Sequence, residues 1–400
     1  MLSALGYSCE ERARLPGEIW SRECDSVAWS FDDVTIAIAG DVNGDGHADI
    51  LLATWSALEM RGVVQVIDSR TGRSLWRFVG DAAEDHLGRL VADFRDIDLD
   101  GNADFAIATW KKGMQIVSGR DGSPIHQGAL DEFYRTTNVA FMQAGPDIDG
   151  DGAPEFVVGV AADGNSIVRV HSGRSGDVLW TFDSRDLNEH KSSPVAWWSV
   201  AVDRMPADAP QSTSTVRILW RPENSRDVPL RERASGSISI HDARTGRLIT
   251  DRPLHAEGTL TVCEVWSKTS VKDQPLVALN TGSRIDLIDA SDTVLRTIAI
   301  PQDSPYATLR DVSLAFLSGA DEPDLLMTAE DGGPDTPFGT GCCAIGFRAT
   351  DSSTCRSQVF PSFDAGLPSV RCIPDVDGDG RDDLVVAIPG RQGSVLAVVH

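Results

Sequence analysis

The sequence predicts an all-β protein: a seven-bladed β-propeller with four-stranded blades, in which the N-terminal strand completes the last blade. Three observations lead to this fold. An acidic nonapeptide occurs four times, a hairpin motif recurs between its copies, and the two ends of the chain hold complementary parts of one repeat. Units of about fifty residues with four short antiparallel strands are typical of propeller blades. We expect residues 1–400 to form one domain, with an extension over 1–15 and blades over 16–400.

The acidic nonapeptide has oxygen-bearing side chains at positions 1, 3, 5 and 9 and glycine at position 6. Its copies, numbered here as the first to fourth loops, are D-V-N-G-D-G-H-A-D (41–49), D-I-D-L-D-G-N-A-D (96–104), D-I-D-G-D-G-A-P-E (147–155) and D-V-D-G-D-G-R-D-D (375–383). Calcium takes six to eight hard oxygen ligands at about 2.4 Å, and a short loop supplies them by curling around the ion. Glycine permits the backbone reversal that turns the carbonyl of position 7 towards the metal. The spacing therefore predicts four calcium loops.

These loops differ from EF-hands, which need a glutamate at position 12 and a helix on either side. Position 12 is Leu52, Ile107, Val158 or Val386, and the residues after position 9 form short apolar runs bounded by turn residues. Such runs are typical of buried strands. We therefore expect each loop to join two β-strands.

A second motif spans residues 62–76, 113–126, 166–180 and 236–250. Each copy has an alternating strand, a turn that ends in glycine and a second short strand, which is the pattern of a β-hairpin. One repeat is then strand, acidic loop, strand, strand, glycine turn and strand.

The spacing of the loops predicts the number of blades. The first three loops begin 55 and 51 residues apart, and the 228 residues between the starts of the third and fourth fit four spacings of 57. Three degenerate blades are expected in that interval, at about 195–360. In each of these blades one segment corresponds to the first strand and the acidic loop of an intact repeat. The segment 195–208 has lost most of the ligand residues, and 261–270 has lost all of them. In 312–326, Asp324 stands at position 9.

The two ends of the chain complete one blade. Residues 393–400 are only the third strand of the last repeat, whereas P-G-E-I-W (16–20) stands before the first. Trp20 precedes the first loop by 21 residues, and Trp76 precedes the second by 20. We predict that the N-terminal strand is the fourth strand of blade 7, which covers sheet edges and closes the ring. The four intact loops then lie in adjacent blades 7, 1, 2 and 3.

These repeats resemble the FG-GAP (VCBS) repeats of integrin α-subunit propellers and of many bacterial surface and secreted proteins. The family frame is kept in H-L-G-R-L-V-A-D-F-R-D-I-D-L-D-G-N-A-D-F-A-I-A-T (86–109), where Leu87 replaces a phenylalanine, and the family tail in V-V-A-I-P-G (385–390). The resemblance covers nearly the whole chain and is most specific in the acidic loops. It implies loops that bind calcium and stabilise blades without performing chemistry.

The resemblance implies four ligand sets, each of four side chains and the carbonyl of position 7, for up to four Ca²⁺ ions. They are Asp41, Asn43, Asp45 and Asp49 with the His47 carbonyl; Asp96, Asp98, Asp100 and Asp104 with that of Asn102; Asp147, Asp149, Asp151 and Glu155 with that of Ala153; and Asp375, Asp377, Asp379 and Asp383 with that of Arg381. The third set departs from the usual pattern, because Glu155 replaces an aspartate and Pro154 stiffens the loop.

The composition argues against several partners. A net charge of −24 disfavours nucleic acids and anionic membranes. No apolar run reaches the eighteen residues of a membrane helix. The first residues show no signal-peptide pattern, so we expect a mature form, a fragment or a cytoplasmic protein.

Cysteines and tryptophans leave alternatives open. Cys342, Cys343, Cys355 and Cys372 cluster late in the chain, where a disulfide-stapled loop and free thiols are both consistent with the spacing. The periodic tryptophans favour packing between blades over a sugar platform. The pair at 197–198 lies outside that period and is a candidate ligand site.

The favoured function is a non-enzymatic recognition or adhesion module for a protein or a polysaccharide. We expect a monomer that is extracellular, at the cell surface or periplasmic, where millimolar calcium would fill such sites. Long excursions over 203–235 and 331–360 are candidate partner loops. The alternative is a propeller enzyme, either a quinoprotein-like dehydrogenase, which the T-G-x-x-x-W turns and the Cys342-Cys343 pair resemble, or a polysaccharide lyase or hydrolase. No G-x-S-x-G, H-E-x-x-H or phosphate-loop motif is present.

Overall fold

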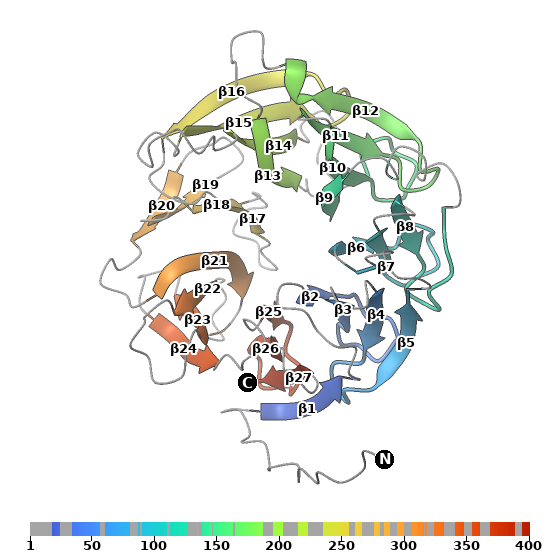
Figure 1. Ribbon diagram of the computed structural model, residues 1–400, viewed down its shortest axis with the longest axis vertical. Helices are drawn as coiled ribbons and strands as arrows, with labels where there is room; N and C mark the ends of the chain where they lie inside the picture. The colour runs from blue at the N-terminus through green and yellow to red at the C-terminus, as the bar shows by residue number, and fades with distance from the viewer. Residues whose placement is uncertain are drawn as a thin grey trace, which may run out of the picture.

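The computed structural model describes residues 18–24, 34–56, 61–80, 87–88, 90–109, 113–126, 134, 138–145, 147–162, 165–186, 195–202, 215–222, 235–255, 261–265, 276–280, 284–288, 294–299, 306–315, 317, 324–331, 341–347, 354–360, 369–388 and 394–400. These residues hold 27 strands in seven antiparallel sheets, six of four strands and one of three. The sheets are arranged around a ring (Figure 1).

The strands follow one order in every sheet, from the inside of the ring outwards. The first three sheets contain β2 (Val34–Ile38), β3 (Ile50–Ser56), β4 (Arg61–Ile67) and β5 (Ser74–Val79); β6 (Leu90–Arg95), β7 (Asp104–Thr109) and β8 (Gly113–Val117); and β9 (Asn138–Ala144), β10 (Phe156–Ala162), β11 (Asn165–His171) and β12 (Val178–Asp183). The next three contain β13 (Val195–Val202), β14 (Thr215–Pro222), β15 (Ser235–Asp242) and β16 (Leu248–His255); β17 (Thr261–Val265), β18 (Leu276–Asn280), β19 (Arg284–Ile288) and β20 (Val294–Ala299); and β21 (Tyr306–Ala315), β22 (Asp324–Asp331), β23 (Gly341–Phe347) and β24 (Thr354–Phe360). The last contains β25 (Ser369–Ile373), β26 (Asp383–Ile388), β27 (Ser394–Val399) and β1 (Glu18–Cys24).

The innermost strands contact one another in a closed order. β25 contacts β2, and the contacts continue through β6, β9, β13, β17 and β21 back to β25. These seven strands line the middle of the ring in Figure 1.

The N-terminal strand joins the last sheet, as the sequence predicts. β1 pairs antiparallel with β27, with Trp20 opposite Val398 and Glu23 opposite Val395. The edge of β27 is thereby covered by a strand from the other end of the chain.

Three of the four predicted hairpins form complete strand pairs, namely β4–β5, β11–β12 and β15–β16. In the fourth, at 113–126, the outer strand is reduced to one bridge between Val117 and Pro124. Proline has no N–H to donate to a ladder, so the pairing cannot extend regularly through this residue. The described part of this sheet therefore has three strands.

The apolar cores lie between neighbouring sheets. Ile50 and Leu52 of β3 pack in a cluster with residues of the last sheet, whereas Leu51 and Ala53 of the same strand pack with residues of the second sheet. Successive side chains of a strand point to opposite faces, and both faces of β3 are covered. This explains why the strands after the acidic loops are continuously apolar.

The interval 195–360, where degenerate blades are expected, holds the strands from β13 to β24 in three sheets. β13 and β17 begin the fourth and fifth sheets, and Asp324 begins β22 as a buried residue, like the residue at position 9 of an acidic loop. The prediction of long excursions over 203–235 and 331–360 was wrong in part, because β14 lies within the first, and β23 and β24 lie within the second. Val216 and Ile218 of β14 are buried in the core against the third sheet.

Among the described residues, no helix has the length and apolarity needed to cross a membrane.

Candidate metal centres

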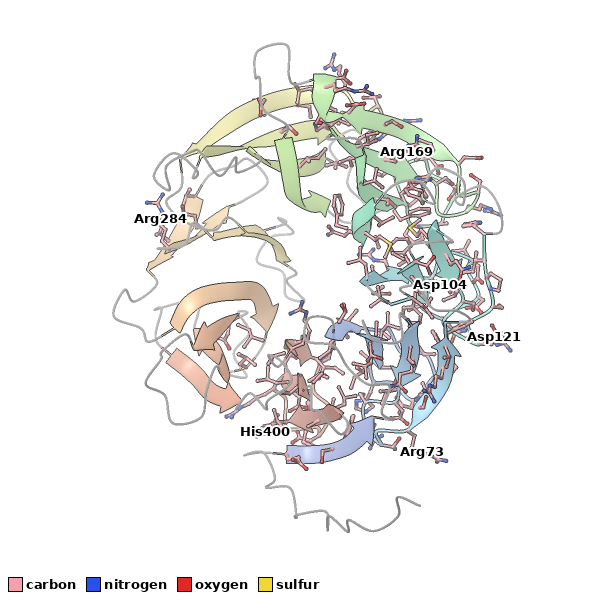
Figure 2. The ribbon with its side chains drawn as sticks, in the orientation of Figure 1. Arg73, Asp104, Asp121, Arg169, Arg284 and His400 are labelled. Carbon is pink, nitrogen blue, oxygen red and sulfur yellow. The ribbon has the colours of Figure 1, made fainter. Side chains whose placement is uncertain are left out.

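Each acidic loop joins the first strand of its sheet to the second. The four loops connect β2 to β3, β6 to β7, β9 to β10 and β25 to β26, as the sequence predicts. The four sheets are consecutive in the ring. Asp104 and His400 mark the second and last sheets in Figure 2.

The backbone reverses at glycine in every loop. The residues at position 6 have left-handed φ angles of 90°, 94°, 90° and 88°, at Gly46, Gly101, Gly152 and Gly380. Position 4 is also left-handed, and in the second loop it is Leu99, with a φ of 64°. A side chain rarely adopts this conformation without cost. This cost explains why glycine stands at position 6 of every loop.

Backbone N–H groups curl around the aspartate at position 1. The N–H of position 6 donates to Oδ2 of this aspartate at 2.8 Å in the first loop, 2.9 Å in the second, 3.0 Å in the third and 2.7 Å in the fourth. Positions 3 and 5 accept in the same way, each from the N–H two residues later. These bonds fix the side chains at positions 1, 3 and 5 in one concave turn.

The carboxylate at position 9 forms the floor of each loop. Asp49, Asp104, Glu155 and Asp383 are all 0% exposed. Each accepts the N–H of position 2, at 3.0, 2.7, 2.5 and 2.8 Å respectively. A buried carboxylate needs such donors or a cation, because desolvation of an ionised group is costly.

Three loops bring three carboxylates together, with one oxygen of each within 4.8 Å of the others. These groups are Asp96, Asp98 and Asp104; Asp147, Asp149 and Glu155; and Asp375, Asp377 and Asp383. In the first loop Asn43 stands where the other loops have an aspartate, so its ligand set includes a neutral amide oxygen. Several hard oxygens from one short loop are the donor set that calcium prefers. The carbonyls of position 7, in His47, Asn102, Ala153 and Arg381, stay predicted ligands.

One buried oxygen of the fourth loop has no hydrogen-bond partner. Oδ1 of Asp104 accepts the Gly119 N–H at 3.1 Å, whereas Oδ1 of Asp383 accepts no hydrogen bond. The Nδ1 atom of His400 lies 3.7 Å from this oxygen. Since buried polar atoms are rarely left without a partner, this oxygen fits a site that a cation completes.

Burial raises the pKa of every carboxyl group at position 9. Desolvation raises the pKa of Asp49 and Asp383 to about 6, that of Asp104 to about 7 and that of Glu155 to about 8. The backbone donors oppose this shift, and the neighbouring aspartates of each loop add to it. These pKa values describe the metal-free chain, in which each loop holds more negative charge than its surroundings stabilise.

Calcium binding to the second and third loops should release protons near neutral pH. A bound cation favours the ionised carboxylate, so it lowers the raised pKa values of Asp104 and Glu155. Protons then compete with calcium below these values. Affinity should fall below about pH 8 at the third loop and about pH 7 at the second, by up to about tenfold per pH unit. Calorimetry in two buffers of different ionisation enthalpy measures the release. E155Q should reduce it, and a buffer-independent enthalpy would contradict the prediction.

Adjacent loops also touch one another. The Nδ1 atom of His47, in the first loop, lies 3.3 Å from the carbonyl oxygen of Asp375, in the fourth. The sequence interpretation gave His47 a role through its backbone only. Its ring also reaches the neighbouring loop, which links two of the candidate centres.

The periodic tryptophans connect neighbouring sheets, as predicted. The indole N–H of Trp20, Trp76 and Trp180 donates to a carbonyl in the hairpin turn of the next sheet, namely that of Ser69 at 2.5 Å, Gly119 at 2.6 Å and Ala243 at 2.6 Å. In the second sheet His126 takes this place, with Nε2 2.6 Å from the Gly173 carbonyl. The side chains of residues 197–198 lie outside the described residues.

Trp76→Phe should lower the free energy of unfolding by about 1 kcal/mol, because the Gly119 carbonyl loses its indole donor. Urea denaturation measures the change. Val79→Thr is the control, because Val79 lies on the same strand with 47% of its surface exposed, and a change within about 0.5 kcal/mol is expected there. Equal stabilities of W76F and the unmodified chain would show that the hydrogen bond contributes nothing.

His400 is the site residue that sequence reasoning missed. It lies far from the fourth loop in sequence, and no ligand spacing indicates it. The register of the last sheet could have indicated it, because Val399 pairs with Leu384, directly after Asp383.

In the predicted cysteine cluster, Cys372 carries a thiol whose Sγ lies 3.5 Å from Asp382 Oδ2. The side chains of Cys342, Cys343 and Cys355 lie outside the described residues.

No protein-family model matches the chain, and no curated protein sequence matches it. The likeness to FG-GAP repeats therefore stays a resemblance.

Solved structures with similar folds are β-propellers. BBS1N, solved in complex with ARL6DN, has a TM-score of 0.55 at 10% identity, over 96% of this chain and 95% of that one. The quinohemoprotein alcohol dehydrogenase ADHIIG from Pseudomonas putida HK5 has a TM-score of 0.51 at 10% identity, over 96% of this chain and 76% of that one. The Dos1 propeller has a TM-score of 0.50 at 9% identity, over 92% and 77%. These likenesses confirm the predicted all-β propeller class and show the fold alone.

Proposed function

We propose that this chain is a single-domain, seven-bladed propeller that binds calcium in four adjacent blades and acts as a non-enzymatic recognition module. Two findings support the blade number: the seven described sheets, and the closed order of contacts among their innermost strands. The pairing of β1 with β27 supports closure by the N-terminal strand. The proposed residues are the four ligand sets named from the sequence.

The observation that carries the proposal is the fully buried carboxylate at position 9, which in three of the four loops lies close to two further carboxylates of the same loop. Three anionic groups within a few ångströms repel one another, and a divalent cation reverses that interaction. Calcium would supply positive charge and would order the loop. The backbone donors already hold the side chains in place, so little rearrangement is needed on binding.

The partner would be a protein or a polysaccharide met outside the cytoplasm. A related fold engages a protein, because BBS1N was solved in complex with ARL6DN. A similar fold also carries an enzyme, the quinohemoprotein alcohol dehydrogenase. The acidic side chains that the loops gather are committed to metal in this proposal. We therefore favour recognition over catalysis.

Metal content tests the calcium sites directly. After dialysis against calcium, elemental analysis should give up to four Ca²⁺ per chain, and D49N, D104N, E155Q and D383N should each lose one. Asp177→Asn is the matched control, because Asp177 is an exposed aspartate of a hairpin turn. A calcium content that none of the four substitutions changes would refute the sites.

A glycan array and a pull-down of candidate surface proteins, each with and without EGTA, test recognition. Calcium-dependent binding to one defined partner supports the module. A bound quinone absorbance, or turnover of an alcohol or an acidic polysaccharide, would instead establish the enzyme.

A further inference from the structure

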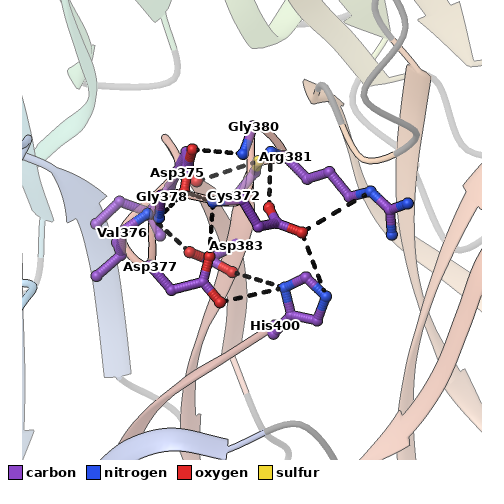
Figure 3. Close-up of polar contacts among 11 residues, drawn as sticks. Cys372, Asp375, Val376, Asp377, Gly378, Gly380, Arg381, Asp383 and His400 are labelled. Atoms are coloured by element: carbon purple, nitrogen blue, oxygen red, sulfur yellow. Dashed lines mark hydrogen bonds and ion pairs between the residues drawn. The ribbon is translucent and has the colours of Figure 1, made fainter.

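Among the described residues, only the fourth loop contributes to a possible ion-holding group that includes a histidine. His400 follows β27, and its side chain is 41% exposed. Its Nδ1 lies 3.5 Å from Asp377 Oδ2 and 3.7 Å from Asp383 Oδ1, and its Nε2 lies 3.6 Å from Asp379 Oδ2 (Figure 3). Three carboxylates from one loop thus surround one ring.

The sheet itself puts this ring beside the loop. β26 and β27 are antiparallel, and Leu384 pairs with Val399. The next residues along the two strands are Asp383, which is position 9 of the loop, and His400. The contact between His400 and Asp383 therefore follows from the register of β26 and β27.

A second observation points to a bound cation. Asp383 is 0% exposed, and its Oδ1 accepts no hydrogen bond. That oxygen is directed at the ring, and a dashed line joins the two in Figure 3. Asp104 is the equivalent residue of the second loop. Its Oδ1 accepts the Gly119 N–H, so the second loop needs no further partner for that atom.

We propose that the fourth loop binds a first-row transition-metal ion, of the class of Zn²⁺ or Co²⁺, in competition with calcium, through one ring nitrogen of His400 together with carboxylate oxygens of Asp377, Asp379 and Asp383. Imidazole nitrogen combined with carboxylate oxygen suits these ions, whereas calcium prefers oxygen alone. Ligands about 2.1 Å from a tetrahedral ion lie about 3.4 Å apart, close to the separations of the ring from Asp377 and Asp383. This inference rests on the proposed function only in placing a metal in this loop.

The chain offers a matched control. His47 also lies beside the fourth loop, but its Nδ1 faces the backbone carbonyl of Asp375 at 3.3 Å. It is not in the group of His400, Asp377 and Asp379 that could hold an ion. His47→Ala should therefore leave transition-metal binding intact, whereas His400→Ala should remove it.

The test is a titration of the calcium-free full chain with CoCl₂, followed by visible absorption, and with ZnCl₂, followed by calorimetry. We expect one tight equivalent of each ion in the unmodified chain and in H47A, and at least a tenfold loss of affinity in H400A. His400→Gln, which keeps the size but not the ring, should behave as H400A. Circular dichroism checks that the variants remain folded.

The proposal is overturned if H400A binds Zn²⁺ as tightly as the unmodified chain, or if no equivalent binds. Calcium content, measured on the same samples, separates this outcome from failure of the proposed function. H400A should keep the calcium content of the unmodified chain, whereas absence of calcium from every loop would refute the calcium propeller and leave the Zn²⁺ result standing.

Discussion

EGTA is expected to lower the free energy of unfolding by about 2.7 kcal/mol for every loop that calcium had filled at a hundredfold excess over its Kd. In the proposed function, calcium binds the folded loops and finds no such sites in the unfolded chain. The raised pKa values of the carboxyl groups at position 9 show the cost of leaving these groups without a cation. Thermal and urea denaturation in calcium and in EGTA measure the difference.

Asp104→Asn isolates the contribution of one loop. The amide keeps the shape of a side chain that is 0% exposed, but it carries no charge. In calcium the variant should lose the stabilisation of one site, about 2.7 kcal/mol. In EGTA its stability should differ less from that of the unmodified chain, because there is no bound calcium to lose and the remaining cost is the amide NH2, which replaces one of the oxygens that accept the Ile97 and Gly119 N–H groups. Asp177→Asn should change neither value. A melting temperature that EGTA leaves unchanged would show that the loops bind no stabilising calcium.

The sequence sufficed for features that are local and repeated. The left-handed glycines at position 6 and the turn glycines such as Gly122 occur at fixed places in each repeat, and the structure confirms the turns that they predict. Even the pairing of β1 with β27 could be predicted, because the tryptophan of the hairpin motif recurs at Trp20 ahead of the first loop.

Features that depend on contacts between distant segments could not be predicted. His400 reaches Asp377 only through the register of β26 and β27. The excursion predicted at 203–235 contains β14, because the weak period of the degenerate blades gave no loop from which to count. Leu99 adopts a φ of 64° at a position where the other loops have glycine, and no local sequence pattern predicts a left-handed leucine.

One turn residue joins a candidate metal loop to the neighbouring sheet. The Gly119 N–H donates to Asp104 Oδ1 at 3.1 Å, while its carbonyl accepts the Trp76 indole N–H at 2.6 Å. Ser69 makes the same pair of contacts, with Asp49 at 3.4 Å and Trp20 at 2.5 Å. The backbone of one residue thus contacts both the floor of a loop and the tryptophan of the preceding sheet. A change there should affect stability and metal affinity together.

Gly119→Ala is therefore expected to lower the free energy of unfolding by about 3 kcal/mol or more. A Cβ at Gly119 would stand 1.7 Å from the carbonyl oxygen of Ala103, so the turn and the second loop must move apart. That movement weakens the bond to Asp104, and calcium affinity at the second loop should fall as well. Ser69→Ala is the control, because the equivalent residue already carries a Cβ and its buried Oγ makes no hydrogen bond. Urea denaturation in saturating calcium compares the two variants. If G119A proves as stable as S69A, the close contact between turn and loop contributes nothing to the fold.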